Sequence, residues 1–341
     1  MPIWLKLFPL NSENLSNLLS LDLSLNVFIQ SGDLAWLSHI LSLRFLDLSL
    51  VDLGAAIHWS QAINKLPSLV HLNLNGCVLL PFSTGSLFHA NFSALFNDLY
   101  GSILDGFGNM ISLAYLDLGY CAFEGEILFA FGDMRALEYL DISGHGLHGF
   151  NSDTFGNMVS LEELFLSHNE LEGEIPKSFG RRLGILDLSS NRLYGSIPDT
   201  VGSMVSLERL SFSESTPKLY LVYNKLNGTL PESIGQLAEL VWFDIGSNSL
   251  QGTISKAHLF NLSNLAHLGL SSSSITFNMS LEWMASRSKP FDEFVIFNSE
   301  ISDILQDWFW NLTFNFNSLN FPTIISRVLP NLSSQFSFFQ T

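Results

Sequence analysis

Six aspartates recur at one position of a repeated pattern, and they are the residues best placed to do chemistry. Each lies between the two leucines, or leucine-like residues, of a short Leu-x-Leu segment: Asp22, Asp47, Asp117, Asp141, Asp187 and Asp244. If these segments are neighbouring strands, the carboxylates project from one face of a sheet. Two interpretations stay open, a hydrated face that discourages edge association and a face that attracts a basic ligand or partner. A flat column offers too few convergent oxygens for calcium, so the sequence predicts no metal site.

Aromatic side chains often stand two residues before these aspartates, in the same outward direction. The series reads Phe45, His71, Tyr115, Tyr139, Glu163, Ile185, Trp242 and His267, and nearby outward positions add Tyr120, Phe165, Tyr220 and Tyr223. Rings beside acids make good anchors for peptides and proteins, although rings also cover a pleated sheet without binding anything. The predicted ligand-binding residues are Tyr115, Asp117, Tyr139, Asp141, Phe165, Tyr220, Trp242 and Asp244.

Catalytic chemistry has no comparable support in the sequence. We find no nucleotide-binding loop, no paired metal-ligand spacing and no nucleophile motif, so we expect neither an enzyme nor a cofactor. His145 is expected in the core, whereas His71 and His267 are expected on the surface. Cys77 and Cys121 are expected two repeats and roughly 10 Å apart, too far for a disulfide, as buried free thiols.

Seven Asn-x-Ser/Thr sequons are candidate glycosylation sites if the chain is secreted. They are Asn14, Asn91, Asn227, Asn261, Asn278, Asn311 and Asn331. Asn14 and Asn261 each lie four residues before a strand leucine, outside the expected concave face. Asn227 and Asn261 are the two sites that we expect to carry glycans.

The elements that would position all these residues follow from the pattern LxxLxLxxNxLxGxIP. One complete copy runs from Leu161 to Pro176, and its glycine recurs mostly every 24 residues between Gly101 and Gly252. A fixed period in this range predicts a leucine-rich solenoid. We therefore expect an α/β solenoid, a right-handed superhelix of leucine-rich repeats with a parallel concave β-sheet.

Each repeat also predicts the residues that hold neighbouring coils together. A buried asparagine should bond the backbone of adjacent turns. The expected ladder is Asn26, Asn97, Asn169, Asn191, Asn224 and Asn248, with Val51, Cys77, Cys121, His145, Ser273 and Ser299 in the same slot elsewhere. On the far side an apolar spine is expected near short helical turns: Phe107, Phe131, Phe155, Phe179, Val201 and Ile234.

The whole chain, residues 1–341, is expected to form one solenoid domain of about 13 repeats with uncapped ends, because each repeat packs only on its neighbours. Irregular units are expected near residues 85–105 and 207–231. In the second, either nine residues are inserted or a repeat has lost its middle, with strands expected at Leu207–Phe212 and again from Leu219.

Composition excludes other classes of function. The net charge of −17 argues against nucleic acid as a partner. No stretch reaches the roughly 18 apolar residues of a membrane span, and the first ten residues make a poor signal peptide.

With its Gly-x-Ile-Pro half, the repeat resembles the extracellular domains of plant leucine-rich-repeat receptor-like proteins and kinases. Residues 52–69 (DLGAAIHWSQAINKLPSL) and 301–312 (ISDILQDWFWNL) are similar to the fungal-xylanase receptor subgroup. The resemblance implies a non-enzymatic recognition module on the extracellular face of the plasma membrane. It would bind a peptide or protein ligand and a co-receptor kinase ectodomain in defence or developmental signalling.

The departures from this family are also informative. Its secretion signal, cysteine-paired cap and membrane helix are not visible, so we expect a piece of an ectodomain whose membrane attachment lies in missing segments. Two alternatives stay open: a secreted cell-wall inhibitor of a microbial polysaccharide-degrading enzyme, and an inactive receptor fragment.

Overall fold

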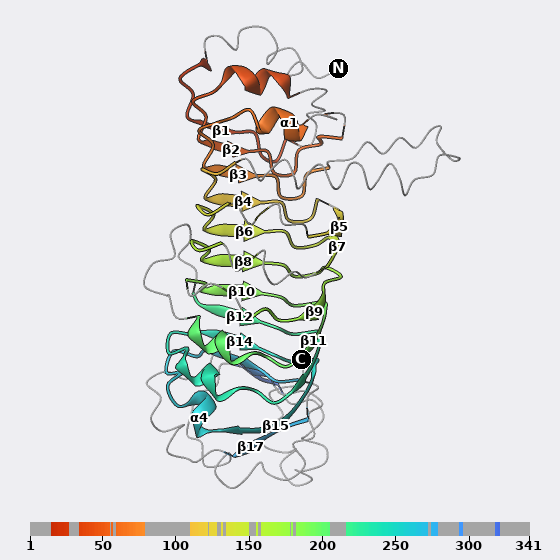
Figure 1. Cartoon of the computed structure of the whole chain (residues 1–341), viewed down its shortest axis with the longest axis vertical. Helices are drawn as coiled ribbons and strands as arrows, with labels where there is room; N and C mark the ends of the chain where they lie inside the picture. The colour runs from red at the N-terminus through yellow and green to blue at the C-terminus, as the bar shows by residue number, and fades with distance from the viewer. Residues whose placement is uncertain are drawn as a thin grey trace, which may run out of the picture.

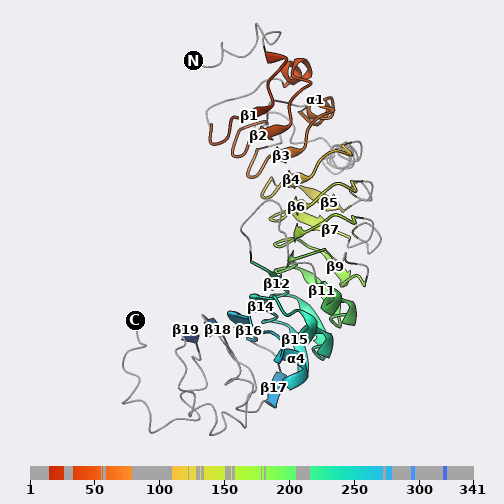
Figure 2. The ribbon, with the colours of Figure 1, turned by 90° about the vertical axis from the view of Figure 1, so that its left-hand side faces the viewer.

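The chain forms an arc of stacked coils with one long parallel sheet on its inner side (Figures 1 and 2). The structure, a computed structural model, describes residues 15–26, 34–54, 56, 59–78, 110–121, 123–127, 131, 134–149, 155, 158–177, 179, 182–204, 216–271, 274–278, 293–295 and 318–320. The expected solenoid and its parallel concave sheet are confirmed.

Among the described residues, the concave sheet contains twelve short strands, named below in the order in which they lie side by side. They are β1 (Ser20–Asp22), β2 (Phe45–Asp47), β3 (His71–Asn73), β4 (Tyr115–Asp117), β6 (Tyr139–Asp141), β8 (Glu163–Phe165), β10 (Ile185–Asp187), β12 (Lys218–Tyr220), β14 (Trp242–Asp244), β16 (His267–Gly269), β18 (Glu293–Val295) and β19 (Ser318–Asn320). Every pair is parallel and in register, for example Leu116 opposite Leu140. The same repeat position therefore forms a continuous column along the sheet.

Alternation along each strand places the leucines inside. In β2, Leu46 is fully buried and Leu48 follows it into the core, while Phe45 and Asp47 stay half-buried on the concave side. Each coil buries about two of these leucines, and each buried leucine side chain stabilises the fold by roughly 1.5–3 kcal/mol. Because the apolar positions repeat in every coil, the cores merge into one continuous interior.

A second set of parallel strands runs along one side of the arc as a two-stranded and a five-stranded sheet, and we call the two together the lateral sheet. The two-stranded sheet consists of β5 (Glu124–Glu126) and β7 (Gly146–His148), and the five-stranded sheet consists of β9 (Glu172–Glu174), β11 (Arg192–Gly195), β13 (Lys225–Gly228), β15 (Ser249–Ser255) and β17 (Ser274–Asn278). Short helices return the chain to the concave sheet: η3 (Ala35–His39), α1 (Trp59–Ile63), η5 (Asp199–Ser203), η6 (Glu232–Gln236) and α4 (Lys256–Leu259). In the part of the chain that the structure describes, no helix is long and apolar enough to cross a bilayer.

The expected asparagine ladder joins consecutive coils. Asn191 donates from Nδ2 to the carbonyl of Leu166 in the preceding coil at 2.9 Å and to that of Leu188 at 3.1 Å. Its Oδ1 accepts the backbone N–H of Leu171 at 3.0 Å. Asn169, Asn224 and Asn248 repeat this arrangement. The buried amides therefore satisfy backbone groups that the turns leave unpaired.

His145 replaces asparagine in this slot and makes the same two kinds of bond. Its Nδ1 accepts the Phe123 N–H at 3.0 Å, and its Nε2 lies 2.9 Å from the carbonyl of Leu118. Nδ1 is thus unprotonated and Nε2 carries the proton, so the ring is neutral. Burial lowers the pKa of His145 to about 4. Its expected place in the core is confirmed.

The two cysteines occupy the same slot in neighbouring coils, because β3 pairs directly with β4. The prediction that they stand two repeats apart was therefore wrong. Both thiols are free and buried, and each donates to a carbonyl, Cys77 to Leu48 at 2.9 Å and Cys121 to Leu74 at 3.0 Å. Burial raises the pKa of Cys77 to about 12, so the thiolate is not formed at neutral pH.

Glycine meets two separate needs in the repeat. The glycine that stands two residues after the leucine of a lateral strand has a positive φ, for example +129° at Gly173 and +79° at Gly195. This is the backbone conformation that residues with a side chain disfavour, as expected. The glycine that follows the spine residue allows close approach instead. A Cβ on Gly202 would lie 2.2 Å from the carbonyl oxygen of Ser233 in the next coil. Phe131, Phe155, Val201 and Ile234 of the spine are buried as predicted, and Phe107 lies outside the described residues.

Both irregular units leave the concave sheet unbroken. β3 pairs directly with β4, so no strand of the unit near residues 85–105 lies between them, and the described sheet has twelve strands where 13 repeats were expected. β10 likewise pairs with β12, so the second unit carries an insertion before Lys218. The strand expected at 207–212 lies outside the described residues, and no strand lies between β10 and β12.

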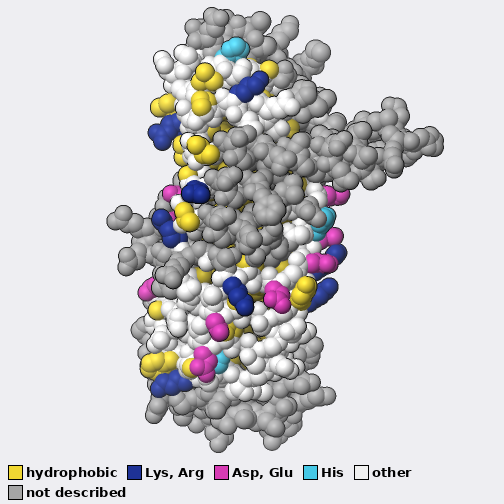
Figure 3. Space-filling model, in the orientation of Figure 1, with side chains coloured by type: hydrophobic (Ala, Val, Ile, Leu, Met, Phe, Trp, Pro, Cys, Tyr) yellow, Lys and Arg dark blue, Asp and Glu magenta, His cyan; other side chains and the backbone are white. Residues whose placement is uncertain are grey.

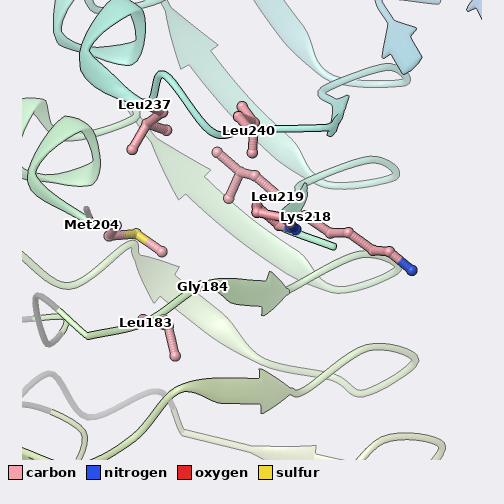
Figure 4. A pocket seen from close by; sticks show the side chains of 8 residues that line it. Leu183, Gly184, Met204, Lys218, Leu219, Leu237 and Leu240 are labelled. Atoms are coloured by element: carbon pink, nitrogen blue, oxygen red, sulfur yellow. The ribbon is translucent and has the colours of Figure 1, made fainter. Parts of the chain in front are cut away.

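A small apolar cavity marks this insertion. Leu183, Met204, Leu237 and Leu240 line it, and Lys218 directs its ammonium away from them (Figure 4). Its free volume of about 10 Å³ is room for one water molecule. It is a packing defect between two coils and not a ligand pocket.

Candidate binding surface

Two stacks of aromatic rings line the concave sheet. The N-terminal ring stack consists of Phe45, His71, Tyr115, Tyr139 and Phe165, one from each strand β2, β3, β4, β6 and β8. The C-terminal ring stack consists of Tyr220, Trp242 and His267 from β12, β14 and β16. The structure thus brings together Tyr115, Tyr139 and Phe165, and separately Tyr220 and Trp242, which were all predicted site residues.

The rings of the N-terminal stack cover each other face to face. Centroids are 4.3 Å apart for Phe45 and His71, 3.9 Å for His71 and Tyr115, and 4.1 Å for Tyr115 and Tyr139, with interplanar angles of 10–14°. These distances follow the spacing of parallel strands, about 4.8 Å. Because the faces are occupied, the stack offers a ligand mainly ring edges and phenol hydroxyls. Tyr139 turns to Phe165, at 5.5 Å and 42°, since β8 has Glu163 at the matching position.

Three members of the outward series do not project as expected. Glu163, Ile185 and His267 are only 3%, 1% and 4% exposed. Ile185 on β10 also separates the two ring stacks. The half-buried rings therefore form two patches along the concave sheet.

The aspartates have a structural task that the sequence interpretation missed. In each of the six, Oδ1 accepts the backbone N–H two residues on: Ser24, Ser49, Gly119, Ser143, Ser189 and Gly246. The Asp-x-Ser/Gly spacing is the sequence signal of such an Asx turn. These carboxylates fix the turn that leads from the strand to the asparagine slot, and the turn leaves their Oδ2 atoms for other partners, as in the bond that Asn73 Nδ2 donates to Asp47 Oδ2 at 3.0 Å.

Asp117 and Asp141 are in-register neighbours on β4 and β6. Asp117 is only 7% exposed although it stands in the same outward column as Asp141, which is half-buried. Asn75 Nδ2 donates to Asp117 Oδ1 at 3.0 Å, and Ser143 Oγ donates to Asp141 Oδ1 at 2.6 Å. Burial raises the pKa of Asp117, and the charge of Asp47 adds to this effect. Burial raises the pKa of Asp141 to about 6, with the charges of Asp117 and Asp187 adding to it.

The tyrosine hydroxyls respond to the same environment. Burial, and then the nearby aspartates, raise the pKa of Tyr220 to about 12 and shift those of Tyr115 and Tyr139 upward as well. The Tyr115 and Tyr139 hydroxyls are also bonded to each other. All three phenols are therefore neutral hydrogen-bonding groups at physiological pH.

The C-terminal stack has the closest ring pair and one acid. Trp242 and His267 lie 3.7 Å apart at 9°, and His267 Nε2 is 3.9 Å from Asp244 Oδ2. Asp244 lies over Gly269, where a Cβ would meet its carboxyl carbon at 2.4 Å. The indole Nε1 of Trp242 is buried and has no hydrogen-bond partner among the described residues.

Charge on the concave face is almost entirely negative. Across the residues described, no lysine or arginine pairs with an aspartate of the column. Arginine forms an ion pair elsewhere: Arg192 pairs with Glu170 at 3.1 Å on the lateral side. Acidic and basic side chains stand together at one edge of the molecule in Figure 3. Within those residues no cluster of three His, Cys, Asp or Glu is arranged to hold a metal.

Of the seven sequons, the structure describes the side chains of two. Asn227 lies on β13 and Asn261 follows α4, and both are exposed and outside the concave sheet. Asn278 ends β17, and the remaining four, Asn14, Asn91, Asn311 and Asn331, lie outside the described residues.

Sequence comparisons agree with this architecture. Two family models, both described as leucine rich repeat, match residues 112–171 and 182–204. Receptor-like protein EIX1 of Solanum lycopersicum is 35% identical over 144 residues, which are 32% of this chain and 14% of that protein. The matched part of the chain is thus similar to plant leucine-rich-repeat receptor-like proteins.

Solved structures similar to this chain include two plant receptor ectodomains. That of GASSHO1/SCHENGEN3 from Arabidopsis thaliana, in complex with CASPARIAN STRIP INTEGRITY FACTOR 2, has a TM-score of 0.64 at 24% identity, over 84% of this chain and 30% of that one. The Arabidopsis receptor kinase HAESA, in complex with the peptide hormone IDA and the co-receptor SERK1, has a TM-score of 0.54 at 25% identity, over 83% and 46%.

An internalin from Listeria monocytogenes reaches a TM-score of 0.62 at 19% identity, over 90% of this chain and 82% of that one. Similarity at this level shows the fold alone. The chain matches only a small part of the length of the curated relative, 14% of it.

Proposed function

We propose that this chain is the ligand-recognition part of a plant cell-surface receptor-like protein, with no enzymatic activity of its own. It binds a peptide or protein on its concave face. The observation that carries the proposal is the pair of ring stacks beside an aspartate column that has no lysine or arginine partner among the described residues. A ligand with basic side chains and hydrogen-bond acceptors complements this surface.

Contacts would be made by ring edges and hydroxyls rather than by ring faces. Tyr139 and Trp242 are the expected anchors because each is half-buried within its stack and so loses little freedom on binding. Asp141 and Asp244 stand two residues further along the same strands and supply negative charge.

We further propose a co-receptor kinase ectodomain as the second partner, in defence or developmental signalling outside the cell. HAESA, with its peptide hormone and co-receptor, supports this proposal by analogy.

A binding screen tests the proposed function. The chain, secreted from plant cells, is immobilised and exposed to secreted plant peptides and microbial proteins, and each ligand found is measured again with Tyr139→Ala and Trp242→Ala. We expect each substitution to weaken binding about 30-fold, as for an anchor worth roughly 2 kcal/mol. Tyr139→Phe separates the hydroxyl from the ring.

Tyr120→Ala is the matched control, since Tyr120 is an exposed tyrosine of a turn outside both stacks. A ligand that binds both alanine variants as tightly as it binds the control would contradict the proposed surface.

A further inference from the structure

Asn227 lies on the outer surface of the lateral sheet, in the sequon Asn227-Gly228-Thr229. It belongs to β13, which pairs with β11 on one side and with β15 on the other. Asn227 and Thr229 are both exposed, and the intervening Gly228 has a φ of +79°. The acceptor amide is therefore open to solvent on a strand whose backbone is held on both sides.

The neighbouring strand places an aromatic ring beside this amide. Tyr194 on β11 is opposite Lys225 on β13, and Asn227 follows Lys225 by two residues on the same face. Two residues along a strand and one strand across correspond to about 8 Å between Asn227 and Tyr194. The first sugar of a glycan at Asn227 can span this distance.

Tyr194 has an open ring face. Its side chain is 51% exposed, and among the described residues no aromatic ring stacks on it and no cation lies over it. The other neighbours of Asn227 are small or flexible: Ser249 stands opposite it on β15, and the methyl of Thr229 leans toward Gly252. Tyr194 is the large apolar surface that a sugar on this sheet would meet.

We propose that Asn227 carries an N-linked glycan whose first N-acetylglucosamine lies on the ring of Tyr194. This rests on the proposed function, since glycan addition requires entry into the secretory pathway. The C–H groups of the sugar cover the tyrosine face and remove apolar area from water, which stabilises the β11–β13 pair. The glycan covers the lateral sheet between β11 and β15 and leaves both ring stacks on the concave face uncovered.

Asn261 provides an internal control. It is exposed as well, but the ring beside it, Phe260, already holds the ammonium of Lys256 at 4.4 Å from its centroid. A glycan there has no comparable open face, so its contribution to stability should not depend on Tyr194.

Peptide mapping tests the modification. The full chain is secreted from plant cells behind an added signal peptide, so that glycan addition does not depend on where the chain naturally resides. Trypsin separates residues 226–256, with Asn227 as their one sequon, from residues 257–287, which hold Asn261 and Asn278. We expect a glycan mass on 226–256 that Asn227→Gln removes. An unmodified 226–256 peptide from secreted chains would overturn the site.

A thermodynamic cycle tests the contact. Glycans are trimmed to one N-acetylglucosamine, and melting is measured for the wild type, Tyr194→Ser, Asn227→Gln and the double variant. Tyr194→Ser should lower Tm by about 2 °C more when the Asn227 sugar is present than when it is absent. The same cycle with Asn261→Gln should show no coupling.

Equal effects of Tyr194→Ser with and without the Asn227 sugar would overturn the stacking. These outcomes differ from failure of the proposed function, which is decided by ligand binding to Tyr139 and Trp242 variants.

Discussion

Replacing His145 by asparagine should remove a pH dependence of stability that is built into the turn ladder. An asparagine there can accept the Phe123 N–H and donate to the Leu118 carbonyl, as Asn169 does one coil further on for its own partners. At pH 7 the two proteins should therefore have similar stability, apart from the ring contact of 4.8 Å between Phe123 and His145, which is lost.

The magnitude follows from the shifted pKa. Folding lowers the pKa of His145 from 6.5 to about 4, because burial penalises the charged ring. As the pH falls below 6.5, the unfolded chain takes up a proton that the folded chain does not, so stability is lost down to about pH 4 and is fully present above 6.5. This linkage costs about 2 kcal/mol at pH 5 and about 3 kcal/mol near pH 4.

A local probe is preferable, because a solenoid can open coil by coil. Hydrogen exchange of the Phe123 amide, which bonds the slot residue, reports opening of this coil. Between pH 7 and pH 5, we expect its free energy of opening to fall by about 2 kcal/mol more in the wild type than in His145→Asn. Asp141, whose raised pKa acts in the opposite direction, is present in both proteins and cancels in the comparison.

The backbone amide of Leu147 is the control, because its acceptor, Oδ1 of Asn169, does not titrate. If the wild type and His145→Asn lost stability equally between pH 7 and pH 5, the assigned role of the buried imidazole would be refuted.

Three further substitutions probe the scaffold, each measured by urea unfolding. Asn191→Ala removes a buried amide that bonds two coils and should cost about 3 kcal/mol; a loss below about 1 kcal/mol would contradict the ladder. Asp141→Asn should stabilise by about 1 kcal/mol at pH 7, because the folded pKa of about 6 exceeds 3.8 and the ionised carboxyl is unfavourable there. That gain should vanish as the pH falls through 6 toward 4, and a pH-independent gain would argue against titration. Gly202→Ala should cost more than about 2 kcal/mol, because its Cβ would meet the carbonyl of Ser233, whereas exposed Thr200→Ala should stay within about 0.5 kcal/mol.

Much of the scaffold could be predicted from residue spacing alone. The Leu-x-Leu segments predicted strands such as Tyr139–Asp141, and the asparagine slot predicted the bonds of Asn191. These features depend on residues within one repeat and its neighbour, and the repeat length fixes which neighbour that is. The Asx turns were also encoded locally, in the Asp-x-Ser/Gly spacing, but that signal was overlooked.

Contacts between distant repeats needed the structure. Tyr115 stacks on His71, 44 positions earlier, because the irregular unit between them adds no strand to the sheet. The same adjacency brings Cys77 and Cys121 into neighbouring coils, against the expectation of two repeats. The number of repeats between two residues in the sequence equals the number of coils between them in the solenoid only where each repeat contributes one strand to the sheet.

The sequence by itself determined which residues point inward in each coil and which backbone groups the slot side chains must bond, since strand alternation and turn chemistry are local. Only the tertiary structure decided how exposed each outward residue is. Asp117 and Ile185 are buried although their positions in the repeat match those of half-buried Asp141 and Tyr139. Burial depends on the side chains of adjacent coils and on what packs over them, and one repeat does not contain that information.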